Sequence, residues 1–199
     1  MCEVMPTPQF NVLGVAGSMR EKSRSSAAVA VALDVARERG ADTRLLHLAA
    51  LDLPMFRPDA RPDTAAVRAA VEAVRWADAL VLATPDYHGS MTGAMKNFLD
   101  YHWKDLTGKL FGYVVASHEK GLTVLEQMRT AVRQCYGWSL PYGVAVHPDA
   151  DCAECAVTNP AVVKRLRMLG RDIVVYGRLL REQYKTDLAE AAGDTFARA

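Results

Sequence analysis

The chain has 199 residues, half of them apolar and 24% charged, with a formal net charge of +1. This length and composition are typical of one globular domain with a substantial core. The balanced charge gives no electrostatic basis for binding nucleic acid or an anionic membrane, and no apolar stretch is as long as a membrane span. The first nine residues lack the basic and apolar regions of a signal peptide, so we expect a cytoplasmic protein.

The first segments alternate between strand and helix patterns. Residues 10–16 form a short apolar run that is typical of a buried strand. Ser23 or Ser25 is placed to cap a helix that runs to Gly40, which suits the position just after a helix end. Residues 42–48 alternate between apolar and polar side chains, which predicts a second strand.

The middle of the chain continues this alternation. Residues 49–63 contain three prolines and predict a long loop, and a helix is predicted to begin near Thr64. Residues 78–84 are apolar and predict a third strand, followed by a helix over residues 92–103. Residues 109–116 predict the fourth strand.

The last third adds one more strand between two helices. A helix is predicted over residues 123–136, a fifth strand over 142–147, and a terminal helix from 159 to about 188 with a bend near Gly170. Five strands that alternate with helices, with near-continuous apolar runs among them, predict a doubly wound parallel α/β sheet with helices on both faces. We expect one domain over residues 1–199, with flexible tails at 1–9 and about 190–199.

The loop after the first strand, GSMREKSRSS at residues 17–26, is rich in hydroxyl and basic side chains. In a doubly wound sheet, ligands bind beyond the carboxyl ends of the strands, and a helix N-terminus favours an anion. Ser18, Ser23 and Ser25 offer hydroxyl groups, and Arg20 offers a planar fork to a phosphate. The glycines of the dinucleotide fingerprint and of the P-loop are absent. The loop therefore suits a terminal monophosphate, and its alternative interpretation is a helix cap with solvated charges.

The loop after the third strand lies within TPDYHGSMTGAMKNFLDY, residues 84–101. In a sheet ordered 2-1-3-4-5, strands one and three flank the switch point, so both loops border one crevice. Tyr87 offers an aromatic face, and Gly89 allows the backbone to approach a flat ligand. The backbone N–H groups from His88 to Ser90 suit acceptors on the edge of a ring. The two loops together predict a planar heterocycle that carries a phosphate.

In order and spacing, these loops resemble those of the NAD(P)H-dependent FMN reductases of flavodoxin-like fold. The first loop of that family reads G-S-x-R-x-x-S-x-[NS], which residues 17–25 match. The second reads P-x-Y-N-G-S-x-x-G-x-x-K-N-x-x-D, which residues 85–100 match except for histidine at position 88. The resemblance covers nearly the whole chain, including LDLPMF at residues 51–56, and it implies a flavodoxin-like fold with sheet order 2-1-3-4-5.

The resemblance implies FMN as the cofactor and NAD(P)H as the hydride donor. It implies that the first loop binds the phosphate, that the second wraps the isoalloxazine ring, and that a third contact loop follows strand four. That third loop is usually glycine-rich in the family, whereas here it carries charged residues between 118 and 120. The residues expected to contact FMN are Ser18, Arg20, Ser23, Ser25, Pro85, Asp86, Tyr87, His88, Gly89, Ser90, Ser117, His118 and Gly121.

The implied activity is a ping-pong transfer of a hydride from NAD(P)H to FMN and on to a flavin, quinone or azo acceptor. No protein nucleophile or general base is required, so we predict no catalytic residue. The alternatives are a flavodoxin-like electron carrier and a flavin-binding sensor without pyridine nucleotide turnover. The near-neutral charge disfavours a carrier, because carriers are often strongly acidic. The resemblance also implies a homodimer or homotetramer.

The remaining candidate groups receive structural interpretations. Cys152 and Cys155 have the spacing of a metal or redox pair, but no second ligand pair accompanies them, and we interpret the spacing as chance. We therefore predict no metal site. Cys135 is expected to be a small core residue. The aromatic residues within 98–103 are compatible both with ordinary packing and with a subunit interface.

Overall fold

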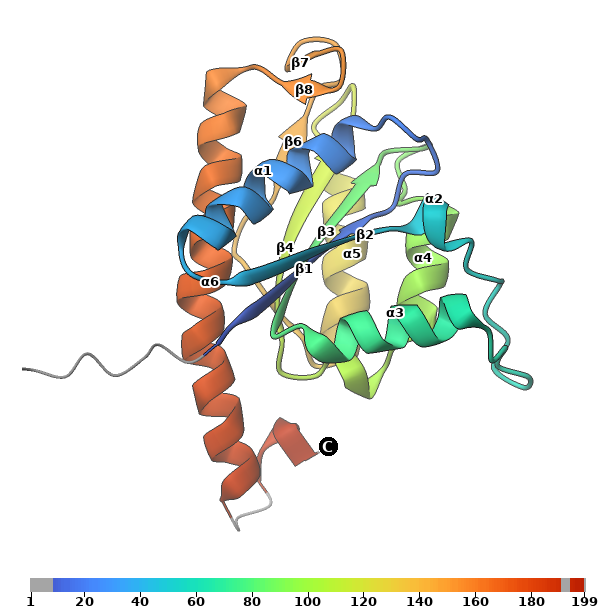
Figure 1. Ribbon diagram of the computed structural model, residues 1–199, viewed down its shortest axis with the longest axis vertical. Helices are drawn as coiled ribbons and strands as arrows, with labels where there is room; N and C mark the ends of the chain where they lie inside the picture. Colours follow the sequence, from blue (N-terminus) through green and yellow to red (C-terminus); the bar gives the residue numbers. More distant parts are fainter. Residues whose placement is uncertain (1–8, 191–193, 199) are drawn as a thin grey trace, which may run out of the picture.

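The computed structural model describes residues 9–190 and 194–198, and most of the two predicted tails lies outside these residues (Figure 1). The strands are β1 (Asn11–Ala16), β2 (Asp42–His47), β3 (Ala79–Pro85), β4 (Leu110–Ala116), β5 (Trp138–Ser139), β6 (Val144–Val146), β7 (Cys152–Ala153) and β8 (Ala156–Val157). The helices are α1 (Arg24–Glu38), α2 (Leu48–Leu51), α3 (Ala65–Trp76), α4 (Gly93–Asp100), α5 (Leu122–Gln134) and α6 (Pro160–Ala189), with 3₁₀ turns η1 (Lys104–Leu106) and η2 (Phe196–Arg198).

The main sheet is parallel, and its order β2-β1-β3-β4-β5 confirms the predicted doubly wound fold. Ala16 at the end of β1 is aligned with His47 of β2 and with Ala83 of β3. Pro85 of β3 is aligned with Ala116 of β4. The carboxyl ends of the central strands therefore meet at one edge of the sheet, which is where the loops that follow β1, β3 and β4 come together.

The fifth position of the sheet differs from the single strand predicted over residues 142–147. Two short strands, β5 and β6, occupy this position, and both pair with β4. Pro141 lies between them and has no N–H group to donate to a neighbouring strand, so the ladder is interrupted there. The strand predicted over residues 142–147 therefore corresponds to β6, and β5 was not predicted.

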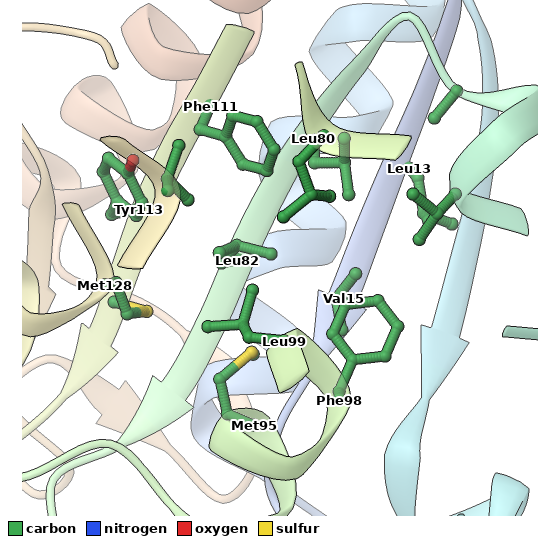
Figure 2. Packing of buried hydrophobic residues seen from close by; sticks show 14 of the residues in the cluster. Leu13, Val15, Leu80, Leu82, Met95, Phe98, Leu99, Phe111, Tyr113 and Met128 are labelled. Carbon is green, nitrogen blue, oxygen red and sulfur yellow. The ribbon is translucent and has the colours of Figure 1, made fainter. Parts of the chain in front are cut away.

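Helices cover both faces of the sheet because successive strand residues point to opposite sides. Leu82 packs in one buried cluster with Met95 of α4 and Met128 of α5, as Figure 2 shows. Val81, the preceding residue, lies in a second cluster with Val29 of α1 and with residues of α6. The central strands β1, β3 and β4 are therefore buried on both faces, which explains their apolar sequences, whereas the edge strand β2 is partly exposed.

The predicted helix starts are confirmed by side-chain caps. Ser23, Thr64, Thr92 and Asn159 each accept a hydrogen bond from a backbone N–H two or three residues further along the chain. Gly40 follows the end of α1 with a φ of 75°, a left-handed conformation that glycine adopts without a Cβ clash. None of the helices within residues 9–190 and 194–198 is both long and apolar enough to cross a membrane.

Two predicted boundaries need correction, and the long terminal helix is confirmed. The loop predicted over residues 49–63 begins with one turn of helix, because β2 ends at His47 and α2 follows directly. The helix predicted over 92–103 ends at Asp100 and is followed by η1. The terminal helix α6 runs without interruption from Pro160 to Ala189. Gly170 marks a close approach rather than a break in this helix, because a Cβ there would lie 2.2 Å from the Ala32 carbonyl oxygen of α1.

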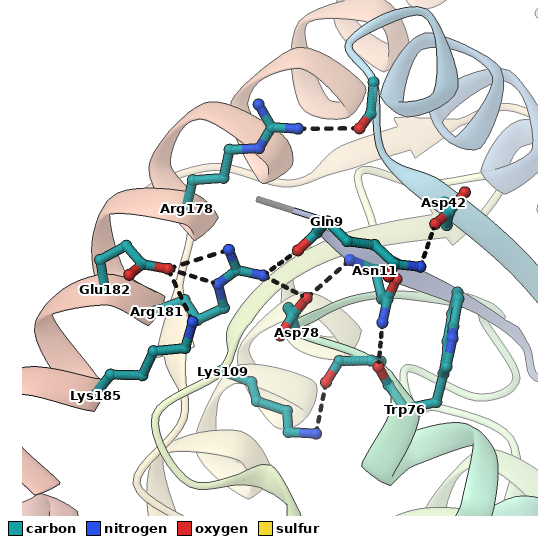
Figure 3. A network of polar contacts seen from close by, with 12 residues as sticks. Gln9, Asn11, Asp42, Trp76, Asp78, Lys109, Arg178, Arg181, Glu182 and Lys185 are labelled. Carbon is teal, nitrogen blue, oxygen red and sulfur yellow. Dashed lines mark hydrogen bonds and ion pairs between the residues drawn. The ribbon is translucent and has the colours of Figure 1, made fainter. Parts of the chain in front are cut away.

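A polar network ties α6 to the amino end of the sheet (Figure 3). Arg181 of α6 donates to Asp78 Oδ2 at 2.9 Å, and the same oxygen accepts from the Asn11 backbone N–H at 2.8 Å. Beside this pair, Lys109 Nζ donates to the carbonyl oxygens of Val74 and Ala77 at 2.6 Å each. The ammonium group therefore satisfies two carbonyls at the carboxyl end of α3, where a cation is favourable.

The free energy of unfolding is expected to depend on the titration of Lys109. Burial lowers the pKa of its amine from 10.5 to about 8, against the attraction of Asp78 and Asp105. Between these two pH values the unfolded chain binds more protons at this site, so the contribution of Lys109 to stability rises with pH. Relative to the Lys109→Met variant, the wild type should gain on the order of 2 kcal/mol between pH 8 and pH 10.5. Urea unfolding of both proteins across this range measures the difference, and parallel pH profiles would contradict it.

Candidate functional site

Three loops meet at the carboxyl edge of the sheet. We call residues 17–23 the phosphate loop, residues 86–92 the ring loop and residues 117–121 the third loop; they follow β1, β3 and β4. They border a cavity of about 330 Å³, within the range of small-molecule sites. Larger hollows lie along α3 and beside α4, away from the carboxyl ends of the strands. Ligands of doubly wound sheets bind at those ends, so the smaller cavity is the better candidate for the ligand site.

The residues predicted to contact FMN lie in these loops or next to them, with Ser25 in the first turn of α1 and Pro85 at the end of β3. Those that line the cavity are Ser18, Arg20, Ser23, Ser25, Pro85, Asp86, Tyr87 and His118. Those that lie beside it in the same loops are His88, Gly89, Ser90, Ser117 and Gly121. The cavity is also lined by Lys22, Arg24, Ala116, Pro148 and Asp149.

Hydrogen bonds from β3 and α4 hold the start of the phosphate loop. The Gly17 N–H donates to the Ala83 carbonyl at 2.7 Å, and Thr92 Oγ1 donates to the Gly17 carbonyl at 2.7 Å. A Cβ on Gly17 would lie 2.9 Å from Met95 Cε, so the close approach of α4 favours glycine there. The sequence predicts only that a helix starts at Thr92. The contact of Thr92 with the phosphate loop was not predicted, because it joins residues 75 positions apart.

Three buried hydroxyl groups gather where the phosphate loop enters α1. Ser18, Ser23 and Ser25 are 4%, 8% and 0% exposed, and the hydroxyls of Ser23 and Ser25 lie 2.9 Å apart. Ser23 Oγ also accepts from the Ser26 N–H, which makes it the N-cap of α1. The first turn of α1 carries no acidic residue, so no carboxylate there competes for its free N–H groups. These features suit an anion at the helix N-terminus.

Two arginines differ in their availability at this end of the cavity. Arg24 Nε donates to the Pro148 carbonyl at 3.0 Å, and its Nη2 lies 3.9 Å from Asp149 Oδ1. Arg24 therefore ties α1 to the loop after β6. Arg20 is exposed, and its guanidinium forms no ion pair with the carboxylates of the described part of the chain. Arg20 is thus the arginine whose fork remains available to a ligand.

The ring loop is a tight turn. Tyr87 and Ser90 exchange two backbone hydrogen bonds of 3.1 Å, and the residues between them, His88 and Gly89, have φ values of 58° and 74°. Two successive positive φ values define a type I′ geometry, in which Asn-Gly is preferred at the two central positions. Histidine is, like asparagine, enriched in this left-handed region among non-glycine residues. The backbone therefore accommodates the histidine at position 88. Tyr87 is 46% exposed beside the cavity.

Side chains from neighbouring elements hold the ring loop. Asp86 Oδ1 accepts from the Gly89 N–H at 2.8 Å. Gln127 of α5 holds the other end, because its Oε1 accepts from Ser90 Oγ at 2.9 Å and from the Met91 N–H at 3.2 Å. Gln127 was not predicted, since nothing in the local pattern of α5 distinguishes it from other exposed helix residues.

The third loop is held by Ser117 and shaped by Gly121. Ser117 is 3% exposed; its N–H donates to the Val146 carbonyl at 3.0 Å, and its Oγ accepts from the Glu119 N–H at 3.0 Å. Gly121 has a φ of 61°, and a Cβ there would lie 2.4 Å from Val115 Cγ1. Gly121 therefore allows the left-handed backbone conformation at the start of α5, where a side chain would clash with Val115.

A cluster of His118, His147 and Asp149 lies at the rim of the cavity, with potential ligand atoms within 4.8 Å of one another. His147 Nδ1 accepts from the backbone N–H groups of Asp149 at 3.2 Å and Ala150 at 3.1 Å. The neutral ring therefore carries its proton on Nε2 and keeps no free lone pair for a metal ion. Metal-binding histidines normally donate from their second nitrogen, and this one accepts instead. The cluster is poorly suited to a metal ion.

The Cys152 and Cys155 pair lies on the β7–β8 hairpin, with Cys155 in its turn. Both are free thiols, and burial raises the pKa of the Cys152 thiol, which disfavours the thiolate that metal binding requires. Cys135 is buried at the end of α5, as expected.

The sheet order and the position of the three loops define a flavodoxin-like protein. Solved structures agree: the flavoenzyme NAD(P)H:(acceptor) oxidoreductase FerB from Paracoccus denitrificans aligns with a TM-score of 0.71 at 21% identity, covering 85% of this chain and 98% of that one. Residues 10–151 match the family model of NADPH-dependent FMN reductase. The chain belongs to this family, whose members are flavin oxidoreductases that use NAD(P)H and FMN.

Curated relatives carry related names. The chain is 28% identical over 179 residues to the NADH-dependent FMN reductase SfnE of Pseudomonas putida, which covers 87% of this chain and 95% of that protein. It is 31% identical over 110 residues to an NADPH azoreductase of Bacillus sp. (strain OY1-2), covering 51% of this chain and 60% of that protein. Several other curated relatives are matched over about half of their length or less.

Proposed function

We propose that this protein binds FMN in the cavity between the three loops and transfers a hydride from NAD(P)H, through FMN, to a flavin, quinone or azo acceptor in a ping-pong cycle. The observation that carries the proposal is the set of buried hydroxyls of Ser18, Ser23 and Ser25 at the N-terminus of α1, beside the same cavity as the ring loop. The cavity has a site for an anion at one end and a loop suited to a flat ring at the other. These two features match the phosphate and the isoalloxazine ring of FMN.

The residues present fit the phosphate end. The hydroxyls of Ser23 and Ser25 can each donate to a phosphate oxygen while Ser23 continues to cap the helix through its lone pair. The free N–H groups of the first turn of α1 and the guanidinium of Arg20 add positive potential. Together these groups offer several donors to the three oxygens of a terminal phosphate.

The other end of the cavity positions a ring. Bound FMN would supply the hydride chemistry, and the protein supplies binding, orientation and electrostatics. The backbone of the ring loop is held in one conformation by the Tyr87–Ser90 turn and by Gln127. The exposed side of Tyr87 leaves room for a nicotinamide or an acceptor to approach by turns, which is what a ping-pong cycle requires. No side chain is assigned as nucleophile or base.

The acceptor, the cellular location and the assembly complete the proposal. The relatives' names include FMN reductase, azoreductase and quinone oxidoreductase, so all three acceptor classes belong in the assay. We propose a cytoplasmic location, as the sequence predicts, and a homodimer or homotetramer, as the family resemblance implies. Light scattering of the purified protein measures the assembly.

The test begins with FMN uptake. Quenching of FMN fluorescence measures binding, and the absorbance of NADPH and NADH then reports turnover with FMN, benzoquinone and an azo dye. Turnover with parallel double-reciprocal plots is the expected result, because the two substrates of a ping-pong cycle bind in turn. FMN binding without turnover would assign an electron carrier or a sensor instead, and failure to bind FMN would overturn the proposal.

A further inference from the structure

We infer that Asp86 is a positioning residue whose carboxylate couples the ring loop to the third loop, so that the two loops form one preorganised cradle. This inference rests on the proposed function, in which both loops hold the flavin ring. It concerns how the protein's own residues support that site, and it assigns Asp86 a role between the loops rather than in direct contact with the ring.

The two carboxylate oxygens of Asp86 point to different loops. Oδ1 accepts from the Gly89 N–H of the ring loop at 2.8 Å, and Oδ2 accepts from Ser117 Oγ of the third loop at 2.8 Å. The Asp86 backbone N–H donates to the Ala116 carbonyl at 2.8 Å, which continues the pairing of β3 and β4 by one residue. The side chain is therefore held at the point where the two loops diverge from adjacent strands.

The hydrogen bonds run in one direction towards the carboxylate. The Glu119 N–H donates to Ser117 Oγ at 3.0 Å, and Ser117 uses its single hydroxyl proton to donate to Asp86. Gly89 donates from the other side. A carboxylate accepts from both sides, whereas an amide at this position would present a donor to one of them. Because the acceptor is ionised, these bonds are stronger than neutral ones.

The burial of these linked hydrogen bonds affects how tightly the site would bind FMN. Ser117 is almost fully buried and Asp86 is half-buried, so water competes weakly for the link between them. Gln127 holds the far end of the ring loop independently, through Ser90 and Met91. Loss of the Asp86 link would free both loops near the β3 and β4 ends, and a ligand would then have to order them on binding, which lowers affinity.

A double-mutant cycle of Asp86→Ala and Ser117→Ala tests the coupling. Each single variant is expected to raise the Kd for FMN by about 10-fold, because bound FMN must then order loops that the wild type already holds in place. The double variant should raise the Kd by clearly less than the product of the two single effects, because both changes break the shared Asp86–Ser117 bond. Each change also removes one bond of its own, to Gly89 or to Glu119. Independent effects would multiply to about 100-fold and would overturn the inference. Asp34→Ala, on the exposed surface of α1, is the control for removing a charge.

Amide hydrogen exchange in the FMN-free protein gives a readout that does not depend on the cofactor. Ser117→Ala should reduce protection of the Gly89 N–H, although Ser117 does not contact Gly89, and should leave the Met91 N–H unchanged because Gln127 holds it. Asp86→Asn should retain more protection at Gly89 than Asp86→Ala. Unchanged exchange at Gly89 in Ser117→Ala would overturn the coupling, even if Asp86→Ala did not fold.

The two measurements separate this inference from the proposed function. If the wild type does not bind FMN, the proposed function fails, while exchange at Gly89 still decides whether the two loops are coupled. If the wild type binds FMN and oxidises NAD(P)H, and Ser117→Ala changes neither the Kd nor the exchange, the proposed function stands and the role of Asp86 is refuted.

Discussion

Replacing Arg20 with alanine is expected to raise the Kd for FMN by about 10- to 100-fold. Arg20 is exposed at the rim of the cavity, next to the buried hydroxyls of the phosphate loop. Loss of a hydrogen bond to a charged group costs about 1.5–3 kcal/mol, which corresponds to this change in affinity. Arg20→Lys keeps the charge but loses the planar fork, so a smaller increase is expected. Fluorescence quenching of FMN measures each Kd.

Two controls make this result specific to the phosphate. Riboflavin has the same ring but no phosphate, so its Kd should be equal for the wild type and Arg20→Ala. Arg39→Ala removes the same charge at the opposite end of α1 and should leave FMN binding unchanged. If riboflavin affinity falls as much as FMN affinity in Arg20→Ala, then Arg20 does not act on the phosphate.

Gly170→Ala is expected to lower the free energy of unfolding by about 3 kcal/mol, the upper end of typical overpacking effects. A Cβ at Gly170 would lie 2.2 Å from the Ala32 carbonyl oxygen and 2.9 Å from Val35 Cβ. The first of these atoms belongs to the backbone of α1 and cannot rotate away, so α1 and α6 must separate. Since both helices pack on the same face of the sheet, their separation disturbs the cluster around Val81. Urea unfolding followed by circular dichroism measures the change.

Gly93→Ala is the matched control for this substitution. Gly93 also lies in a helix, but a Cβ there would meet nothing within 4 Å. Its replacement should leave the free energy of unfolding unchanged or raise it by up to about 1 kcal/mol, because alanine reduces the conformational freedom of the unfolded chain. Equal unfolding midpoints for the wild type and Gly170→Ala would show that α1 and α6 do not cross as closely as the structure places them.

The parts of the fold that follow from local chemistry could be predicted from the sequence. Apolar runs marked β1, β3 and β4, and alternation marked β2. Ser23, Thr64 and Thr92 marked helix starts, because a cap acts on the next few residues of the chain. The doubly wound parallel class of the sheet followed from the alternation of strands and helices, and its order was implied by the resemblance to the FMN reductases. The phosphate loop could be located for the same reason: its position after β1 and its hydroxyl groups are local properties.

Features that join distant segments could not be predicted in this way. The sheet ladder beside β4 is interrupted at Pro141, so the fifth position holds two strands. Gly170 had the pattern of a helix bend, whereas its role depends on α1, more than 100 residues earlier in the chain.

The cradle formed by the ring loop and the third loop shows both kinds of feature, those set by local sequence and those set by tertiary contacts. The sequence placed the hydroxyls, the ring loop and the third loop at one sheet edge, because parallel strands end on the same side. It carried no sign that Asp86 would bond to Ser117, or that Gln127 would hold Ser90, since these pairs are 31 and 37 residues apart. Hydrogen bonds between loops form only after the strands are aligned in register, so their partners depend on the packed sheet and not on the residues adjacent in the chain.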